Sequence, residues 1–530
     1  MRRGWLLGSS LVLALTAGSS GWATEAPVAG FEPDPEILRA LDVIRSEPVR
    51  HGFLARVRAA KVAREAVERG DKAFGGTVVQ GTVAAPVVTT TFSNVGAPYA
   101  AANLQQMLFN GPWPTGTMTE YYDEISYGNL NVPGTVYNWV PLPQADTYYA
   151  GTGNGLTCNG RVWELIQQSL TTNDGAVNFA QYDNDGPDNI PNSGDDDGFV
   201  DFVAFVHPET GGECGGNNNI WSHRFSLTGW GQACGGGIGA FTTNDASANG
   251  GNIRVDDYTI QPARSCFGGG QIEIGVFAHE FGHAFGLPDL YDTDGSSQGI
   301  GAWGLMASGS YGGDNASPDR PTHMCAWSKA YLGWITPAVH AWSDGGVAGL
   351  QILNAEENPA ALKVGFAPGV SPNEYFLLEV RRKIGFDDSL IQDGLLVWHI
   401  DDAKWTPGGP NTANVQECID GPVVGPCGAN HATVALEQAD GLFHLEHGVN
   451  RADAGDPFRP MAGTFFGKNT TPWTYDYNRA NVNAYWLFQN LEDSQFVPSA
   501  MRFTITRPVS CGTVATDARG GLVAYALLFA

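Results

Sequence analysis

The spacing of hydrophobic residues predicts helices in some stretches of the chain and strands in others. Near the N-terminus, Ile37, Leu38, Leu41 and Ile44 recur at helical spacing, which predicts a short amphipathic helix. A weaker helical stripe continues through residues 53–62, until a cluster of glycines ends the pattern. The beginning of the chain is therefore predicted to be largely helical.

Beyond position 78 the pattern changes to short runs rich in β-branched residues. Two such runs, 78–88 and 132–140, flank a helical patch at 104–108. A further apolar strand is expected at 199–207, inside a stretch rich in Gly, Asp and Asn that covers 174–219. The middle of the chain is thus expected to combine strands with helices and long polar loops.

Helical periodicity returns over 271–285 and again over 321–332. After Trp334 the chain consists of short alternating runs separated by turn residues, for example 375–380 and 395–400. Runs of this kind are typical of strands, so the last part of the chain is expected to form a separate β-rich domain.

Length, composition and charge narrow the possible functions. The chain has 530 residues, of which 43% are hydrophobic, enough for two or three domains with real cores. Its formal net charge of −26 argues against binding to nucleic acid or to an anionic membrane surface, because both would repel it. Only 16% of the residues are charged whereas 69 are Gly and 31 are Pro, which favours a loop-rich globular protein over a disordered polyanion.

The first residues have the layout of a secretory signal peptide. Two arginines precede an apolar run at 5–15, and Gly21 and Ala23 are the small residues expected before a cleavage point. The apolar run is too short to span a bilayer, and no later stretch reaches the roughly 18 apolar residues that a spanning helix needs. We therefore expect residues 1–23 to be removed and the protein to be secreted into the extracellular space without a membrane anchor.

The eight cysteines are consistent with an exported protein. None of them follows a CxxC spacing, so disulfide bonds are a better interpretation than a cysteine zinc site. We expect local bridges between Cys418 and Cys427 and between Cys214 and Cys234, and we assign no partners to the other four cysteines.

Residues 275–292 contain the motif that points to a chemical function. His279 and His283 lie at i and i+4 of a predicted helix with an apolar start, so both imidazoles lie on one face and can hold a single Zn²⁺. Glu280 lies beside them, where it can act as the general base that activates water. The alternative, a helix with two surface histidines, fits poorly with the apolar flanks.

The residues after the second histidine offer a third metal ligand. Gly286 allows the helix to end and the chain to turn back, and Pro288 forbids its continuation. A chain that turns back at Gly286 can bring Asp289, ten residues after His279, toward the metal as a third ligand. Asp292 is the competing candidate, and either carboxylate could instead orient a ligand through a hydrogen bond.

A methionine turn and two tyrosines extend the motif. Met306 lies in a turn of small residues at 303–309, and HExxHxxGxxD followed by such a turn resembles the metzincin clan of zinc peptidases. Hydrolysis of a peptide bond also needs a donor that stabilises the oxyanion, and Tyr311 is the candidate for this role, with Tyr291 behind it.

Longer stretches of the chain resemble the immune inhibitor A family of secreted metallopeptidases. The resemblance covers roughly residues 78–470 and implies a zinc endopeptidase that is exported as a zymogen and acts on proteins. The matching stretches are YYDEISYGNL (121–130), IWSHRF (220–225), HEFGHAFGLPDLYD (279–292), WGLMASGSY (303–311), the Ala-Trp and Leu-Gly-Trp pattern of 321–334, NEYFLLEVRRKIGFD (373–387), GLLVWHID (394–401) and LEQADG (436–441).

The resemblance bears on two open points. The family usually has an acidic residue where this chain has Leu290, so a ligand role there is excluded, which favours Asp289. It also implies that the free N-terminus of the propeptide, here Thr24, can block the metal. The propeptide contains no cysteine, so latency through a thiolate on the metal is excluded.

A second group of carboxylates lies in the Gly/Asp/Asn-rich stretch. Alternating carboxylates interrupted by glycine suit Ca²⁺, which takes six to eight oxygen ligands from a tightly turned loop. Neither run has the glutamate of an EF-hand at the twelfth position, and a solvated acidic loop is the alternative. The candidate calcium ligands are Asp183, Asp185, Asp188, Asp195, Asp197 and Asp201.

Two other functions compete with that of a zinc peptidase. Residues 295–299 (GSSQG) match the GxSxG pattern of serine hydrolases literally, but they lie in a polar loop and not at a strand-to-helix turn. The rival from another class is a non-catalytic, calcium-stabilised secreted adhesin or binding protein with a relic zincin domain. The intact Glu280 argues against it, because a binding protein has no need of that base.

Together these observations predict an α+β fold, with a zincin-like or metzincin-like catalytic domain in which a twisted sheet lies above the active-site helix. The expected partners are protein or peptide substrates, with the protein's own propeptide as an inhibitor. The expected parts are a signal peptide (1–23), a basic helical propeptide (24–76), the catalytic domain (77–340), a β-rich C-terminal domain (341–510) and a tail of unassigned role (511–530).

Overall fold

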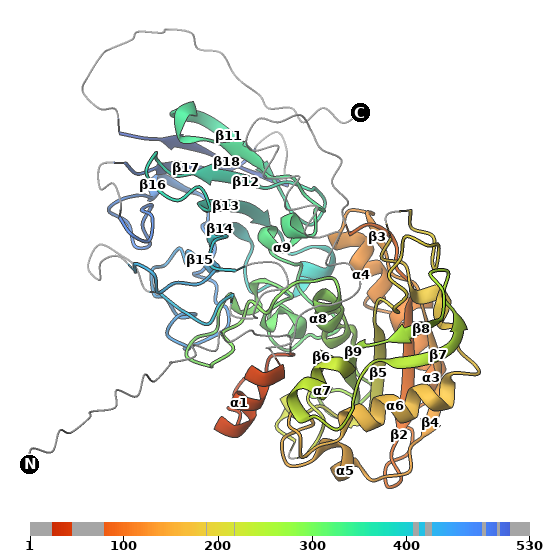
Figure 1. Cartoon of the computed structure of the whole chain (residues 1–530). Coiled ribbons are helices and arrows are strands. Elements are labelled where there is room, and N and C mark those ends of the chain that lie inside the picture. Colours follow the sequence, from red (N-terminus) through yellow and green to blue (C-terminus); the bar gives the residue numbers. More distant parts are fainter. Residues whose placement is uncertain are drawn as a thin grey trace, which may run out of the picture.

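The molecule has mixed α and β structure arranged in two lobes (Figure 1). The predicted signal peptide, the helical stripe at 53–62, Cys511 and the C-terminal tail lie outside the part of the chain that is described. The computed structural model describes residues 24–44, 79–186, 188–216, 218–405, 413–418, 427–479, 484–494 and 499–508.

The first lobe is built on a five-stranded sheet of order β4-β2-β5-β9-β6. The first four strands are parallel, and β6 is an antiparallel edge strand. On β5, Ala204 and Val206 face one hydrophobic core whereas Val203 and Phe205 face another, so the sheet is covered on both faces. The strands are β2 Ala85–Thr91, β4 Gly134–Pro141, β5 Val203–Thr210, β6 His223–Ser226 and β9 Asp257–Arg264.

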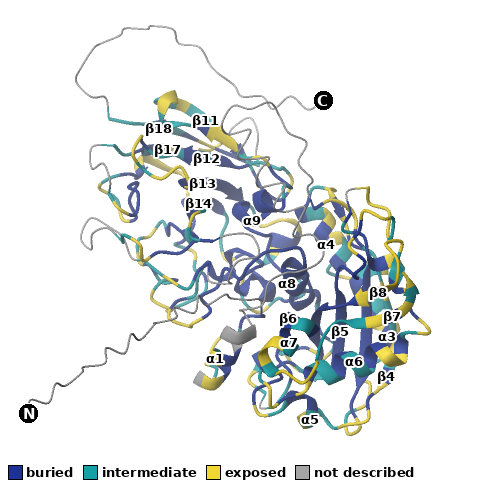
Figure 2. Ribbon diagram, in the orientation of Figure 1, coloured by how far each residue is buried: buried dark blue, intermediate teal, exposed yellow. Residues whose placement is uncertain are grey.

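Helices pack on the two faces of this sheet. On one face lies α8 (Ile274–Ala284), within the predicted 271–285 helix, and every one of its residues is buried (Figure 2). Next to it lies α4 (Met118–Ile125), whose Tyr122 hydroxyl donates a 2.6 Å hydrogen bond to the Ala278 carbonyl. On the other face lies α6 (Val162–Asn173), which sequence periodicity did not predict because polar residues interrupt its apolar stripe.

Shorter elements complete this lobe. The helices are α1 Pro35–Ile44, α3 Ala101–Gln105 with the π-turn Gln106–Asn110, α5 Asp146–Ala150 and α7 Leu227–Cys234. Helix α9 Ala326–Tyr331 lies where the lobes meet, against β13 of the second lobe (Figure 1). Single turns of 3₁₀ helix lie at Phe179–Tyr182, Gly212–Cys214, Gly301–Trp303 and Ser308–Tyr311. Two small pairs of strands are β1 Gly81–Thr82 with β3 Leu130–Asn131, and β7 Phe241–Ala246 with β8 Asn252–Val255.

The second lobe contains two packed sheets. The first has the order β10-β12-β13-β14-β15 and the second β11-β18-β17-β16. Their bounds are β10 Ala338–His340, β11 Val347–Leu353, β12 Leu362–Gly365, β13 Glu374–Arg381, β14 Gly394–Asp401, β15 Val434–Leu436, β16 Met461–Phe466, β17 Leu487–Asp493 and β18 Ala500–Thr506, with 3₁₀ turns at Trp342–Asp344 and Gly385–Ser389.

The two lobes share a hydrophobic core. Along β13, Phe376 and Leu378 face the second sheet of their own lobe, whereas Leu377 faces the core that also contains α8. On β14, Trp398 likewise faces the first lobe. Alternate side chains of one sheet therefore bind the second lobe to the first, close to the helix that carries the two histidines.

Three disulfide bonds lie within the described residues. Cys418–Cys427 forms as expected, but the expected Cys214–Cys234 bridge was wrong. Because β5 and β9 are parallel neighbours, the turns that follow them meet at one edge of the sheet and bring Cys214 beside Cys266. Cys234 ends α7 and pairs with Cys158, and Cys325 is buried and free.

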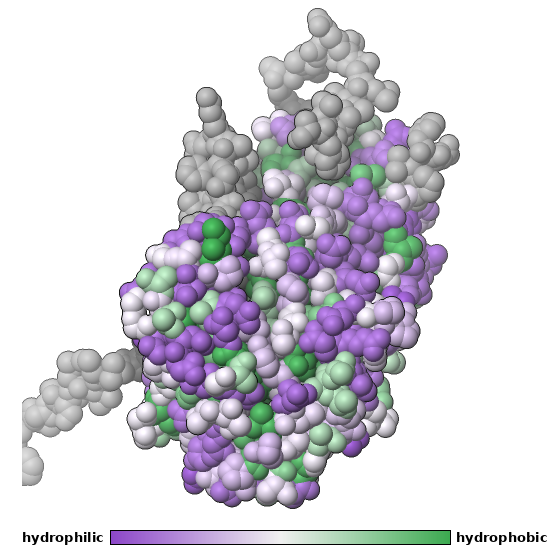
Figure 3. Space-filling view, turned by 90° about the vertical axis from the view of Figure 1, so that its right-hand side faces the viewer, coloured by the Kyte–Doolittle hydropathy of each residue, from purple (hydrophilic) through white to green (hydrophobic). Residues whose placement is uncertain are grey.

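The surface of the first lobe is mainly polar on the face that Figure 3 shows. Hydrophobic residues are scattered over this face. Among the described residues, no helix is both long enough and apolar enough to cross a membrane.

Candidate active site

Helix α8 rests directly on the segment that carries Met306. A Cβ on Gly282 would lie 2.4 Å from the Met306 Sδ, and a Cβ on Gly275 would lie 1.9 Å from the Ser310 carbonyl oxygen. Both distances are shorter than any real contact, so these two glycines are what lets the helix approach so closely. The methionine thus lies beneath the turn of α8 that carries His279 and His283.

The two histidines of α8 point their Nε2 atoms at each other. His279 Nδ1 lies 2.9 Å from the Leu305 carbonyl, and His283 Nδ1 lies 2.9 Å from the Leu287 carbonyl. A carbonyl only accepts hydrogen bonds, so each Nδ1 carries a proton and Nε2 is the ring nitrogen that faces the other histidine. The two Nε2 atoms are 3.0 Å apart, a separation that a shared proton or a shared cation would stabilise.

Asp289 joins the two histidines after the chain reverses. Gly286 has φ +100°, which a side chain would strain, and it allows the turn at the end of α8. The Leu290 amide then donates to the Met306 carbonyl over 2.6 Å, which fixes the returning segment. Asp289 Oδ1 lies 3.1 Å from the Nε2 atoms of both histidines, and one atom from each of the three residues lies within 4.8 Å of the others.

The electrostatics of this trio match a cation site. Burial by itself raises the pKa of the Asp289 carboxyl, but the adjacent His283 and His279 outweigh burial and hold that pKa below its usual range. The carboxyl group is therefore ionised across the physiological pH range. With both rings neutral, the two ring nitrogens and the carboxylate would offer three ligand atoms to one metal ion.

Asp292, the competing candidate, has a different position. Its carboxylate accepts hydrogen bonds from Ser296 Oγ and the Ser297 amide, each at 2.7 Å, and from the Asp294 amide at 3.0 Å. It therefore shapes the loop that contains the GSSQG sequence. Burial raises the pKa of this carboxyl group to about 6.

Glu280 lies buried on the same helix. Neither of its carboxylate oxygens has a hydrogen-bond partner among the residues the structure describes. Burial raises its pKa well above the usual range, although the neighbouring His279 opposes the shift. A buried carboxyl group left without partners is costly, and such groups cluster at functional sites.

The segment that begins at Thr24 crosses this site. The Thr24 amide donates to Asp289 Oδ2 over 3.1 Å, and the Thr24 carbonyl oxygen lies 3.1 Å from His279 Nε2. Both Thr24 and Glu25 are fully buried. These contacts put the start of the predicted propeptide directly over the trio of candidate ligands.

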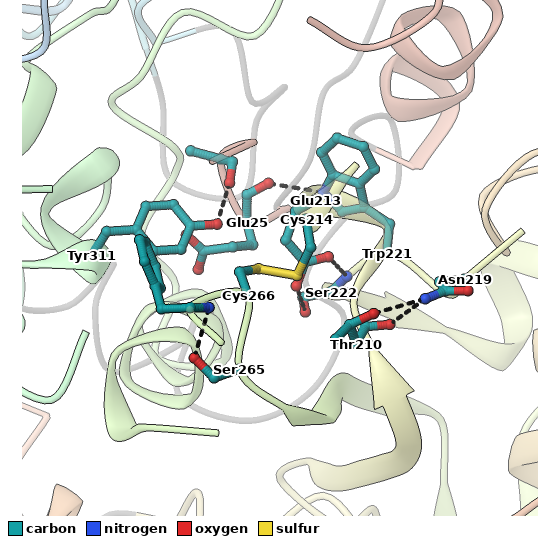
Figure 4. The surroundings of a disulfide bond; sticks show 12 residues. Glu25, Thr210, Glu213, Cys214, Asn219, Trp221, Ser222, Ser265, Cys266 and Tyr311 are labelled. Atoms are coloured by element: carbon teal, nitrogen blue, oxygen red, sulfur yellow. Dashed lines mark hydrogen bonds between the residues drawn. A yellow bond between two sulfur atoms is a disulfide. The ribbon is translucent and has the colours of Figure 1, made fainter. Parts of the chain in front are cut away.

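The Glu25 side chain is fully buried among the residues that surround the Cys214–Cys266 disulfide (Figure 4). Its Oε1 accepts a 2.5 Å hydrogen bond from Ser310 Oγ, and its Oε2 has no partner within the described part of the chain. Burial raises the pKa of Glu25 to about 8, with a smaller contribution from the buried Glu213. Sequence reasoning singled out neither glutamate.

Both candidate tyrosines contact the same segment. The Tyr311 hydroxyl donates to the Ala26 carbonyl over 2.6 Å, and the Tyr291 hydroxyl donates to the Thr24 carbonyl over 2.8 Å. Of the two phenols, Tyr291 is thus the one hydrogen-bonded to the carbonyl that lies beside His279. Burial raises the pKa of Tyr311 well above its usual range, so the phenol remains a proton donor.

Three of the predicted calcium ligands meet in a separate cluster. One carboxylate oxygen from each of Asp183, Asp185 and Asp201 lies within 4.8 Å of the others. Both oxygens of Asp183 are buried, and they have no hydrogen-bond partner among the described residues. Burial, together with the charges of neighbouring aspartates, raises the pKa of Asp183 to about 8.

The other predicted calcium residues hold the shape of the loop. Asp196, which was not predicted, has the same role, because its Oδ1 accepts a 2.6 Å hydrogen bond from the Gly186 amide. The observed contacts are Asp188 Oδ1 with the Ile190 amide at 2.8 Å, Asp195 Oδ1 with Ser193 Oγ, and Asp197 Oδ1 with the Phe199 amide at 2.8 Å.

Comparisons with known proteins agree on the class, which is a peptidase. Residues 68–335, half of the chain, match the catalytic domain of the immune inhibitor A peptidases, M6. The chain belongs to this family.

Two relatives illustrate the match. The pre-pro-metalloprotease PrtV of Vibrio cholerae serotype O1 is 30% identical over 252 residues, which are 44% of this chain and 26% of PrtV. Immune inhibitor A of Bacillus thuringiensis subsp. alesti is 32% identical over 238 residues, 41% of this chain and 31% of that protein. The match therefore spans only about a quarter to a third of the length of these relatives.

Proposed function

We propose that this peptidase is a secreted, zinc-dependent endopeptidase that is made as a zymogen. The observation that carries the proposal is the convergence of two histidine lone pairs and the Asp289 carboxylate beside the partnerless Glu280, all under a peptide backbone. The family membership supplies the reaction class, and these residues supply the means.

The side chains present fit a zinc ion. His279, His283 and Asp289 would hold it, in the nitrogen and oxygen ligand set that catalytic zinc sites use. When bound, zinc would supply a Lewis acid that polarises a carbonyl and lowers the pKa of water. The Leu305 and Leu287 carbonyls hold the two imidazoles in the tautomer that this requires.

In the mechanism we propose, Glu280 moves the proton. Its carboxylate takes a proton from the attacking water and returns it to the amine that leaves. Burial raises the pKa of the Glu280 carboxyl, and the charge of a bound cation would act in the opposite direction, toward the ionised form that accepts the proton. A tyrosine hydroxyl donates to the oxyanion; Tyr311 and Tyr291 remain the candidates, and the 2.8 Å contact with the Thr24 carbonyl favours Tyr291.

Latency follows from the position of the segment that starts at Thr24. Its backbone occupies the space that a substrate and a water molecule would need above His279 and Asp289. We propose that the protein's own propeptide inhibits the enzyme in this way, and that removal of residues 24–76 opens the cleft.

We further propose that calcium binds between Asp183, Asp185 and Asp201. The two buried carboxylate oxygens of Asp183 have no hydrogen-bond partner among the described residues, and a cation would offset the cost of their burial. The cluster lies in the loop before β5, so the ion would stabilise the polar loop that leads into the central sheet.

The test of the main proposal is the variant Glu280→Gln. We expect it to bind zinc in the same stoichiometry as the wild type and to lose casein hydrolysis, because an amide cannot take up the proton. Glu357→Gln, at an exposed glutamate, is the matched control and should keep wild-type activity. Full activity of Glu280→Gln, or wild-type hydrolysis that survives a zinc chelator, would refute the proposal.

A further inference from the structure

Residues 24–28 lie in the cleft as an extended peptide that is held mainly by its backbone. Thr24 forms an antiparallel bridge with His223 on the edge strand β6. The Glu25 amide donates to the Ser222 carbonyl over 3.2 Å. The Thr24 hydroxyl and the Glu25 carboxylate also form hydrogen bonds, with Tyr291 and Ser310, but a segment that adds to the edge of a sheet is held largely through its main chain, so the same cleft can accept other peptides.

Four consecutive carbonyls of this segment each accept a hydrogen bond from a side chain of the cleft wall. Three of the donors come from the first lobe, and the fourth, Arg451, comes from the second lobe. The pairs are Thr24 with Tyr291 (2.8 Å), Glu25 with Trp221 (2.8 Å), Ala26 with Tyr311 (2.6 Å) and Pro27 with Arg451 Nη2 (2.7 Å).

Arg451 is held in place from two directions. Its backbone carbonyl accepts a 2.7 Å hydrogen bond from the Ala302 amide, and its Nε donates to Gln298 Oε1 over 2.9 Å. A Cβ on Gly301 would lie 2.0 Å from the Arg451 carbonyl oxygen, so the glycine is needed for this approach. The guanidinium is therefore pre-positioned at the cleft by the segment that leads to Met306.

Within the described part of the chain, Arg451 forms no ion pair with a carboxylate. None of the ion pairs between described residues includes it, although the chain as a whole is strongly acidic. Its Nη1 is buried and has no hydrogen-bond partner in the described part of the chain. A largely buried guanidinium left in this state is costly unless it binds something, and what it binds here is a peptide carbonyl.

Resting on the proposed peptidase function, we infer that Arg451 is a substrate-binding residue that binds the carbonyl of the third residue after the cleaved bond. The Thr24 carbonyl lies nearest the metal-binding histidines, in the place of the scissile carbonyl. Glu25, Ala26 and Pro27 then mark three positions on the leaving-group side. The second lobe thus completes the cleft, which takes peptides that extend at least three residues beyond the cleaved bond.

The experiment compares the matured enzyme with Arg451→Ala on a series of peptide amides. The peptides share one sequence before the cleaved bond and carry one, two, three or four residues after it. For the wild type we expect kcat/KM to rise when the third residue is added. Arg451→Ala should lower kcat/KM about ten- to a hundredfold for the two longer peptides and leave the two shorter ones unchanged, as loss of a charged hydrogen bond implies.

Two controls separate substrate binding from a structural role. Arg459→Ala, at an exposed arginine of the same lobe, should match the wild type on all four peptides. A peptide whose third carbonyl is reduced to a methylene should be cleaved as slowly by the wild type as by Arg451→Ala. Only direct contact with that carbonyl predicts this equality.

The outcomes distinguish this inference from the proposal beneath it. If the wild type cleaves none of the peptides, the endopeptidase proposal is wrong and this inference fails with it. If the wild type is active but Arg451→Ala slows all lengths equally, or slows none, the peptidase proposal stands and the role of Arg451 is overturned.

Discussion

The two aspartates that follow the HExxH sequence allow a sharp test of the site. We expect Asp289→Asn to lose zinc, because the amide keeps the size of the side chain but not the charge that faces both Nε2 atoms at 3.1 Å. Substitutions of groups that only orient a ligand typically weaken metal binding 10- to 100-fold, so loss of a ligand should weaken it by about a hundredfold or more. Caseinolytic activity should disappear with the metal.

Asp292→Asn is the matched comparison. Asp292 accepts three hydrogen bonds with two oxygens, and asparagine offers only one acceptor. At least one donor, such as the part-buried Asp294 amide, then loses its acceptor, at a cost of up to about 1–3 kcal/mol, which lowers the melting temperature by a few degrees. Zinc content should stay at the wild-type level.

The assay measures the number of zinc ions bound per protein after dialysis against a series of buffered free-zinc concentrations. A melting curve is recorded for each variant. We expect two separate effects: Asp289→Asn loses zinc, and Asp292→Asn loses stability. If Asp292→Asn loses zinc while Asp289→Asn keeps it, the assignment of the third ligand from the geometry is wrong.

Two further predictions concern packing and calcium. Gly282→Ala should lower the free energy of unfolding by about 1–3 kcal/mol and reduce the activity, because its Cβ would meet the Met306 Sδ at 2.4 Å. A melting temperature and an activity equal to those of the wild type would contradict this contact. Without calcium, the pKa of Asp183 is raised from about 4 in the unfolded chain to about 8 in the folded protein. The contribution of this carboxyl group to the stability is therefore fully present below about pH 4 and is lost as the pH rises through about 8. Calcium binds the ionised form, so the rise in melting temperature on adding calcium should be larger at pH 8 than at pH 5, and equal shifts at both values, or none, would rule the site out.

Features that depend on neighbours in sequence could be predicted from the chain. The helix that carries His279 and His283 was expected at 271–285 and is observed at Ile274–Ala284, because an apolar stripe at helical spacing is a local property. The strands expected at 375–380 and 395–400 are found as β13 and β14 for the same reason.

Features that depend on which strands become neighbours could not be predicted. Cys214 and Cys234 are close in sequence, yet Cys214 forms its disulfide bond with Cys266, because β5 and β9 are neighbouring parallel strands. The choice between Tyr311 and Tyr291 as the proposed oxyanion donor stays open, and the carbonyl that each hydroxyl contacts, Ala26 or Thr24, is likewise set by the tertiary structure. The spacing of residues along the chain indicates neither the partner of Cys214 nor the contacts of the two tyrosines.

The sequence by itself determined the class of protein and the residues able to hold a metal, because the HExxH spacing, the helix end at Gly286 and the returning Asp289 are all encoded within a few helical turns. Only the tertiary structure brought Arg451 of the second lobe to a cleft whose other wall is the edge strand β6. Contacts across hundreds of residues arise from the shared core of the two lobes, and no periodicity in the sequence records how those surfaces meet.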